Sequence, residues 1–341
     1  MKRMLKKIFR ILGYFFSVII FLSLIALWKN PIQEPVAIGT TFRDFHAENF
    51  GLDPKEVYIA MLDDLGIKKL RLAAYWDKVE LQNEQFTYDW LDWQINEAAK
   101  RDVEIVLAVG RKLPGWPECF IPDWAEALTQ EAMHEELLDY TAETINRYKN
   151  NPAIEMWQVE NEPFLPFGHC PVYEDKGEKL ERQIALVHAL DPSRQVLVTD
   201  SGELSLWIQA AKRSDIFGTT MYRHIYSNKF GYITYPLPAA FFRVKRGFME
   251  LFVDGRHEAI VIELQGEPWY PGFLPDAPLE EQAKTMDFDK FVATLDYAKR
   301  SGFDTYYTWG VEWWYWMKVT HNDPRIWEYM KEEIAALEAG K

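Results

Sequence analysis

The chain has 341 residues, of which 48% are hydrophobic and 15% aromatic, and it contains 14 tryptophans. This apolar content is enough for a large core and excludes an intrinsically disordered chain. The net charge of −14 argues against nucleic acid and other polyanions as partners, the more so because the charged residues among the first 30 are all basic.

The N-terminus carries a basic cluster followed by an almost wholly apolar run, Ile11–Trp28 ("ILGYFFSVIIFLSLIALW"). A helix of this length spans roughly 27 Å, which is close to the thickness of a bilayer core. A cleaved signal peptide would have a shorter apolar core and a small-x-small cleavage site, whereas Leu27 and Trp28 follow Ala26 here. The run therefore favours a single N-terminal transmembrane helix over a cleaved signal peptide.

The positive charge before the apolar run indicates that this end lies in the cytoplasm. We expect a cytoplasmic basic stub and transmembrane anchor at 1–30, a linker at 31–35 and a catalytic body at 36–341 that faces outside the cytoplasm. The protein would then be a single-pass membrane protein, or a secreted one if the N-terminal segment is cleaved.

From residue 36 onward, short apolar strands alternate with amphipathic helices. The eight predicted strands lie at 36–42, 68–76, 104–110, 153–159, 195–200, 215–222, 259–265 and 304–310. The helix after the first strand is the clearest, because Asp53 is a good N-cap, Pro54 suits the first helical position and Gly66 stops the helix. The chain is therefore predicted to contain eight strand-helix pairs in succession.

The strands are continuous apolar runs rather than alternating ones, which is typical of parallel strands covered on both faces. Eight such units predict an α/β fold of the (β/α)8 TIM barrel type. A doubly wound open sheet is the structural alternative. It would usually carry a glycine-rich phosphate turn after the first strand, and the segment "TTFRDFHAEN" has no such turn.

Functional side chains of such a barrel lie where the strands end and in the loops that follow. At these positions carboxylates and tryptophans are frequent, while the spacing of a Cys/His metal site and a serine nucleophile elbow are both absent. Two carboxyl groups in a cleft lined with aromatic rings can hydrolyse a glycosidic bond, because one protonates the leaving oxygen while the other attacks or activates water. No cofactor is expected.

Two segments carry a family resemblance. "QVENEP" after the fourth strand and "IVIELQ" in the seventh resemble signatures of the clan A glycoside hydrolases, which include family 5 cellulases and mannanases, family 10 xylanases and the family 35 and 42 β-galactosidases. The resemblance implies that Glu162 is the general acid/base, that Asn161 binds the sugar 2-hydroxyl and that Glu263 is the nucleophile. Carboxyl groups in these roles lie about 5–5.5 Å apart and give retention of configuration.

The same resemblance implies three further roles at strand ends. Arg71 would orient the nucleophile, Tyr222 would hydrogen-bond to it and Trp309 would form a sugar platform. Alternatives stay open for two of them, since Arg71 would also fit an ion pair at the rim of the core and Trp309 would also fit plain packing. Additional candidates for substrate binding are the strand-end and loop tryptophans Trp76, Trp116 and Trp269.

Each proposed catalytic residue has a competitor close by in the sequence. Glu160 precedes Glu162 by two residues, and Glu267 follows Glu263 in the segment "ELQGEPW". We favour the pair Glu162 and Glu263 because these two match the motifs, and we expect Glu160 to support the site.

The two cysteines, Cys119 and Cys170, fall in the loops after the third and fourth strands. Neighbouring strands of a barrel bring these loops side by side on one face, and a disulfide is permitted outside the cytoplasm. We expect a disulfide that braces the rim of the cleft, with two free thiols as the alternative.

The sequence thus predicts a membrane-anchored retaining glycoside hydrolase that cleaves β-linked oligo- or polysaccharides by double displacement. A non-catalytic glycan-binding or scaffold protein on the same barrel is the alternative, and the intact pair Glu162 and Glu263 disfavours it. A barrel aldolase would require a Schiff-base lysine or a phosphate-binding glycine turn near the last two strands, and neither is present. The identity of the sugar is set by loops that carry no readable code.

Overall fold

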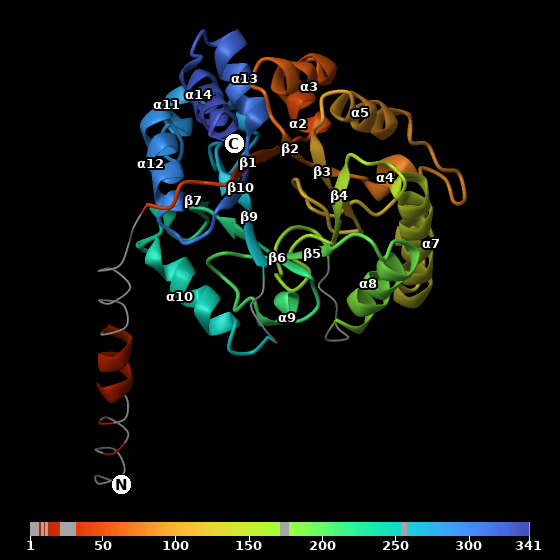
Figure 1. Cartoon of the computed structure of the whole chain (residues 1–341), viewed down its shortest axis with the longest axis horizontal. Helices are drawn as coiled ribbons and strands as arrows, with labels where there is room; N and C mark the ends of the chain where they lie inside the picture. The colour runs from red at the N-terminus through yellow and green to blue at the C-terminus, as the bar shows by residue number, and fades with distance from the viewer. Residues whose placement is uncertain are drawn as a thin grey trace.

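The computed structural model describes residues 7, 10, 13–20, 32–170, 177–253 and 258–340. Eight parallel strands close into a barrel in the order β1-β10-β9-β6-β5-β4-β3-β2, with helices around it (Figure 1). The barrel strands are β1 (Ala37–Thr41), β2 (Lys69–Ala73), β3 (Glu104–Val109), β4 (Ile154–Val159), β5 (Val196–Asp200), β6 (Ile216–Met221), β9 (Glu258–Gln265) and β10 (Thr305–Trp309). The predicted (β/α)8 barrel and its eight strands are confirmed.

The helices fill the connections between these strands. They are α2 (Asp44–Asn49), α3 (Pro54–Asp63), α4 (Trp76–Val79), α5 (Asp89–Ala99), α6 (Asp123–Glu126), α7 (Gln130–Tyr148), α8 (Glu178–Leu190), α9 (Ile208–Ala211), α10 (Ala240–Met249), η1 (Leu274–Asp276), α11 (Leu279–Gln282), α12 (Phe288–Lys299), α13 (Val311–Thr320) and α14 (Arg325–Ala339). Helix α3 begins as the sequence predicts, because the Asp53 side chain accepts a hydrogen bond from the backbone N–H of Lys55.

A short antiparallel hairpin, β7 (His224–Ser227) and β8 (Gly231–Thr234), follows β6 and was not predicted. It lies on the side of the barrel from which the strand ends emerge, because it continues directly from the carboxyl end of β6. The segment after β6 is therefore ordered as a hairpin that adds to the rim.

Apolar side chains form two packing layers. A small cluster fills the inside of the barrel with residues such as Val106, Leu197 and Ile262, and a larger one lies between the strands and the helices. Six tryptophans are fully buried: Trp76, Trp157, Trp207, Trp313, Trp314 and Trp327. Much of the high tryptophan content therefore serves the core rather than the substrate.

Strand β9 contains an irregularity that positions one candidate catalytic residue. Between Val261 and Leu264 it has one residue more than the paired segments of β6 and β10. Glu263 lies within this bulge. Because a β-bulge re-aims the side chains around it, it gives a physical reason for a carboxylate to turn into the barrel mouth from an otherwise apolar strand.

Little of the predicted N-terminal anchor is described. Residues 13–20 are helical, and the remaining residues of the run 11–28 lie outside the described residues. Across the part of the chain that the structure describes, none of the helices has both the length and the apolar character required to cross a bilayer. In the expected linker at 31–35, the backbone N–H of Gln33 donates to the carbonyl of Lys299, so the chain is already attached to the barrel there.

Candidate active site

Glu263 is held at the barrel mouth by two donors from neighbouring strands. Arg71 of β2 donates from Nη1 to Glu263 Oε1 at 2.7 Å, and the Tyr222 hydroxyl, just past β6, donates to Oε2 at 3.0 Å. Arg71 is fully buried and Glu263 is 5% exposed. A buried carboxylate requires a charged partner and hydrogen bonds. Here each carboxylate oxygen of Glu263 accepts one hydrogen bond. The arrangement pairs the carboxyl group with a positive charge and fixes its orientation.

Arg71 also connects Glu263 to the end of β4. Its Nε donates to Gln158 Oε1 at 2.8 Å, and its Nη2 donates to Asn161 Oδ1 at 2.7 Å. The Asn161 oxygen also accepts hydrogen bonds from Gln158 Nε2 at 3.3 Å and from the Thr199 hydroxyl at 3.1 Å. One guanidinium fork on β2 therefore orients residues at the ends of β4 and β9 at once, which suits the planar set of donors of arginine.

Glu162 lies in a different environment from Glu263. It is 5% exposed, its φ is +44°, and its Oε1 accepts a 3.3 Å hydrogen bond from the Thr220 hydroxyl. Burial raises the pKa of Glu162 well above its usual range, and the negative charges of Glu118 and Glu263 raise it further against the opposing charge of Lys112. The raised pKa favours the protonated form of Glu162, which is the form a general acid requires.

Glu160 takes a structural position. It is fully buried, and its carboxylate accepts hydrogen bonds from the backbone N–H groups of Arg111 at 3.1 Å and Lys112 at 2.8 Å. Gly110 allows this close approach, because a Cβ there would lie 2.8 Å from the carboxyl carbon of Glu160. The side chain thus fastens the loop after β3 to the end of β4, in agreement with the supporting role expected for it.

A second buried ion cluster surrounds Glu267, the sequence competitor of Glu263. Arg43 Nη2 lies 3.0 Å from Glu267 and 3.1 Å from Glu312, and His46 Nε2 lies 2.8 Å from Glu267. Although burial acts in the opposite direction, Arg43 and His46 lower the pKa of Glu267 to about 2. Glu267 is thus an ionised partner of Arg43, which disfavours it as the alternative nucleophile.

The donor atoms of His46, Glu267 and Glu312 lie within 4.8 Å of one another, so the cluster has the composition of a metal site. The Arg43 guanidinium lies among these groups and already compensates both carboxylates. Sequence reasoning missed Arg43 and His46, which follow β1. The signal was present, because "TTFRDFH" ends a barrel strand with an arginine and a histidine.

Comparison with known proteins places the chain in a family. The model for "Glycosyl hydrolases family 2, TIM barrel domain" matches residues 58–235, which is more than half of the chain. The chain belongs to this family. The predicted kinship with the glycoside hydrolase barrels is confirmed, while the motifs had pointed to families 5, 10, 35 and 42 without naming family 2.

Individual relatives of this family 2 chain are distant. It is 26% identical over 147 residues to β-galactosidase BgaA of Clostridium cellulovorans, a match that spans 37% of this chain and 22% of that enzyme. Two solved structures share the fold. Exo-β-1,4-mannosidase Op5Man5 from Opitutaceae bacterium strain TAV5 has a TM-score of 0.58 at 14% identity, and the match covers 88% of this chain and 59% of that one. A GH5_18 protein from Streptomyces cattleya has a TM-score of 0.57 at 13% identity, and the match covers 82% of this chain and 71% of that one.

Tryptophan Trp309 of this family 2 chain lies at the end of β10, where the sequence predicts a sugar platform. It is 8% exposed, and the Arg43 guanidinium carbon stacks 3.9 Å from the centre of its ring. Arg43 therefore connects the second ion cluster to Trp309 and fixes the plane of the ring.

Two of the other predicted tryptophans join a row of aromatic rings. The Tyr222 ring lies 5.3 Å from that of Trp269, Trp269 lies 6.0 Å from Phe167, and Phe167 lies 5.8 Å from Trp116. Trp116 is 60% exposed, so the row leads from the side chain that bonds Glu263 to the outer surface. Phe167 was not predicted, because the loop after β4 shows no periodic pattern.

The prediction of Trp76 as a substrate-binding residue is wrong. Its side chain is fully buried, its Nε1 donates to Glu80 at 2.8 Å, and its ring stacks on Tyr140 at 5.6 Å. Trp76 is the first residue of α4 and faces the helix layer, so its position after β2 in the sequence was misleading.

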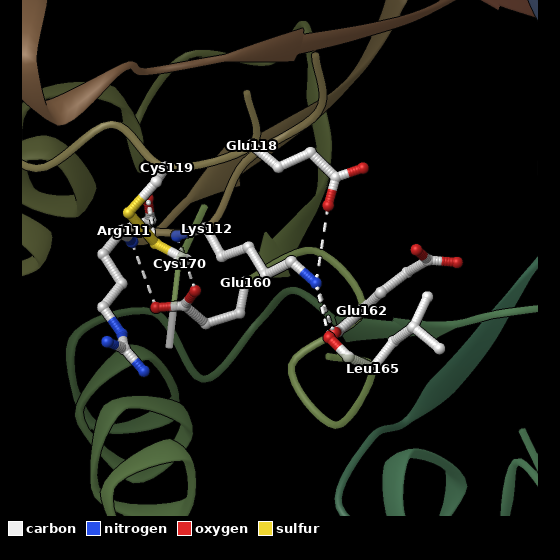
Figure 2. The surroundings of a disulfide bond; sticks show 8 residues. All are labelled: Arg111, Lys112, Glu118, Cys119, Glu160, Glu162, Leu165 and Cys170. Carbon is white, nitrogen blue, oxygen red and sulfur yellow. Dashed lines mark hydrogen bonds and ion pairs between the residues drawn. A yellow bond between two sulfur atoms is a disulfide. The ribbon is translucent and has the colours of Figure 1, made fainter. Parts of the chain in front are cut away.

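Cys119 and Cys170 form a disulfide between the loops after β3 and β4. Next to it, Lys112 Nζ donates to the carbonyls of Glu162 and Leu165, each at 3.0 Å, and lies 3.4 Å from Glu118 Oε2. Figure 2 shows this lysine between the Glu118 carboxylate and the backbone that carries Glu162. Lys112 and Glu118 were not predicted, although Glu118 immediately precedes a cysteine of the expected disulfide.

Proposed function

We propose that this family 2 chain is a retaining glycoside hydrolase that acts on β-linked sugars by double displacement. The observation that carries the proposal is the contrast between two carboxyl groups of one site. Glu263 is paired with Arg71 and Tyr222, whereas Glu162 is buried beside negative charges that raise its pKa. Environments that differ in this way support Glu263 as the nucleophile and Glu162 as the acid.

In the first step, a Glu263 oxygen attacks the anomeric carbon while Glu162 gives its proton to the leaving glycosidic oxygen. The products are a covalent glycosyl-enzyme ester and the free alcohol of the leaving group. In the second step, Glu162 takes a proton from water as the water oxygen displaces Glu263. The cycle restores a protonated Glu162 and an ionised Glu263.

The groups around the pair have parts in this scheme. Asn161, whose amide oxygen is turned toward Arg71, would hydrogen-bond the sugar 2-hydroxyl. Trp309, supported from one side by Arg43, would carry an apolar face of the sugar bound at the nucleophile. Interactions of this kind strengthen as the sugar approaches the oxocarbenium-like transition state.

The first sugar to test is galactose, because the curated relative that covers part of this chain is a β-galactosidase. The match spans 22% of that enzyme, and the solved neighbours include a β-1,4-mannosidase, so β-mannosides form the second set. Glucosides and other β-linked aryl glycosides complete a panel.

The proposal is tested by measuring hydrolysis of this panel with the wild type, Glu162→Gln and Glu263→Gln. Each substitution should reduce kcat on the active substrate by about 10³-fold or more, because it removes one partner of the proton transfer or of the covalent step. Glu126→Gln, an exposed residue of α6 past β3, is the matched control and should keep wild-type activity. Wild-type turnover by Glu263→Gln would contradict the nucleophile assignment.

The stereochemistry is read separately by NMR of the first product formed from the active aryl glycoside. A retaining enzyme releases the β-anomer first, whereas the α-anomer would exclude double displacement. Tight glycan binding without turnover of any substrate would support the alternative of a non-catalytic binding protein.

We also propose that the apolar run Ile11–Trp28 anchors the protein in a membrane with the barrel outside the cytoplasm. The length and composition of the run support this proposal, as does the disulfide on the barrel, which suits an oxidising compartment. The full chain should remain in the membrane pellet after extraction with alkaline carbonate. Release into the supernatant would contradict an anchor.

A further inference from the structure

Helix α10 exposes a stripe of large apolar side chains. Val244, Phe248, Leu251 and Phe252 are 47%, 44%, 78% and 48% exposed. Their spacing of four, three and one residues places them on one face of the helix and of the turn that extends it. The Phe248 and Phe252 rings pack 5.0 Å apart. We name these four residues the α10 stripe.

The opposite face of α10 already packs against the barrel. Ala240, Phe242 and Met249 are buried there, and the inward-facing Lys245 donates to the carbonyl of Gly202. Helix α10 therefore packs against the barrel without using the α10 stripe. Contiguous exposed apolar side chains beyond that requirement mark an interaction surface.

The topology places the α10 stripe at the end of the barrel away from the catalytic pair. Leu251 and Phe252 follow α10 and precede β9, so they lie where β9 begins. Glu162 and Glu263 lie where parallel strands end. Strand β1 also begins at the end occupied by Leu251, because β1, β10 and β9 are parallel neighbours.

The segment that leads to the N-terminus contacts the end of α12. Lys299 accepts a hydrogen bond from the N–H of Gln33 and pairs with Glu34 at 3.4 Å. Four residues after Lys299, the ring of Phe303 lies 5.6 Å from the Arg246 guanidinium of α10. Figure 1 shows α10 in the ring of helices around the barrel, between α9 and α12. Helix α10 and the start of the chain that leads to β1 therefore both contact the segment 299–303.

Chain length limits how far the α10 stripe can lie from the apolar run. The run ends at Trp28, and the described chain starts again at Ile32, which is 48% exposed. Four residues span at most about 14 Å when fully extended. If the run crosses a bilayer, this end of the barrel must lie at the surface of that bilayer.

We propose that the α10 stripe docks on the surface of a phospholipid bilayer, with the catalytic mouth turned away from the membrane. The proposal rests on the membrane anchor proposed above. Arg243 and Arg246 of the same helix point away from the stripe, toward the Gly302–Phe303 turn, and Arg246 pairs with Glu250 at 3.1 Å. The docking therefore rests on the apolar side chains of the stripe, which suit the acyl boundary of a bilayer.

The test uses the full chain in vesicles and an environment-sensitive NBD label at Leu251→Cys. Both native cysteines form the disulfide, so the introduced thiol is labelled selectively. The matched control is the same label at Leu81→Cys, which is 71% exposed between α4 and α5, beyond the carboxyl end of β2. Vesicles of phosphatidylcholine with and without phosphatidylglycerol are compared, each also prepared with brominated acyl chains.

Docking predicts a severalfold rise in NBD emission in vesicles and quenching by brominated lipids at position 251, with neither change at position 81. Equal emission at both positions in floating vesicles overturns the docking and leaves the anchor intact. Failure of the chain to float with the vesicles overturns both proposals. A rise that follows protein concentration rather than lipid would assign the stripe to a second copy of the chain and also overturn the docking.

A second variant guards against misfolding of the labelled chain. Phe252→Glu in the full chain should still float, because the anchor is unchanged, and should retain hydrolysis of a soluble substrate. With the label at position 248 (Phe248→Cys), this variant should lose at least half of the emission gain seen without it. An undiminished gain would contradict contact between the stripe and lipid.

Discussion

At the scale of single residues, the site is organised by the way positive charges are shared among buried carboxylates. Arg71 serves Glu263, Arg43 serves Glu267 and Glu312, and Lys112 lies beside Glu118. The pKa of Glu162 lies well above its usual range, because burial and the negative charges of Glu118, Glu263 and Asp200 outweigh the charge of Lys112. Burial also raises the pKa of Glu118, to about 7. The acid is thus specified by what surrounds it.

This arrangement predicts opposite changes in the pH profile for two substitutions. Glu118→Gln removes a negative charge and lowers the pKa of Glu162, whereas Lys112→Met removes a positive charge and raises it. Activity requires protonated Glu162, so it falls as the pH rises through that pKa. The alkaline limb of kcat/KM should move by about one pH unit to lower pH in the first variant and to higher pH in the second. If the alkaline limb moved in the same direction in both variants, a general loss of structure would explain the change instead.

At the scale of secondary-structure elements, strand ends and loops decide which aromatic rings can reach a substrate. The loops after β3, β4 and β9 carry Trp116, Phe167 and Trp269 into one row, while the first turn of α4 turns Trp76 into the core. The sequence shows all of these rings next to strands, and the direction of each side chain follows from the local backbone.

This difference between the tryptophans can be measured. Trp76→Ala should lower the free energy of unfolding by about 3–5 kcal/mol, because it leaves a cavity in the core and removes the hydrogen bond to Glu80. Trp116→Ala should leave stability within about 0.5 kcal/mol, since the side chain is 60% exposed, and raise KM for oligosaccharides. Chemical denaturation and steady-state kinetics check the two effects. A stable Trp76→Ala protein with raised KM would restore the substrate-binding role.

The disulfide joins two of these loops, and we expect its removal to change both the stability of the protein and the pKa of Glu162. It closes a loop of 51 residues, so its removal should cost about 4 kcal/mol by chain entropy. The double variant Cys119→Ser/Cys170→Ser should also loosen Glu118 and move the alkaline limb of kcat/KM toward that of Glu118→Gln. Thermal unfolding with and without reductant and the pH profile measure both consequences. An unchanged pH profile would show that Lys112 holds Glu118 without the disulfide.

At the scale of the whole molecule, the closed barrel separates two ends with different tasks. One end gathers Glu162, Glu263 and the aromatic row, and the other carries the α10 stripe and the start of β1. This polarity is a consequence of parallel strands, because every strand ends on the same side. An enzyme attached at one end would therefore present its site to substrates at the other.

The sequence by itself determined the barrel and the two motif carboxylates, because both depend on local signals. Apolar runs separated by capped helices specify eight strands, and Asn161-Glu162-Pro163 and Glu263 mark two of their ends. The barrel predicted from the sequence also places the loops that carry Cys119 and Cys170 side by side.

Only the tertiary structure decided which of the neighbouring charges act together. The Arg71 fork to the ends of β4 and β9, the Arg43 cluster on Trp309, and the Lys112 contact with Glu118 join residues far apart in the chain. Their roles depend on burial and on the direction of side chains, which barrel closure and the bulge in β9 set. Periodicity in the sequence indicates neither the burial of these side chains nor their direction.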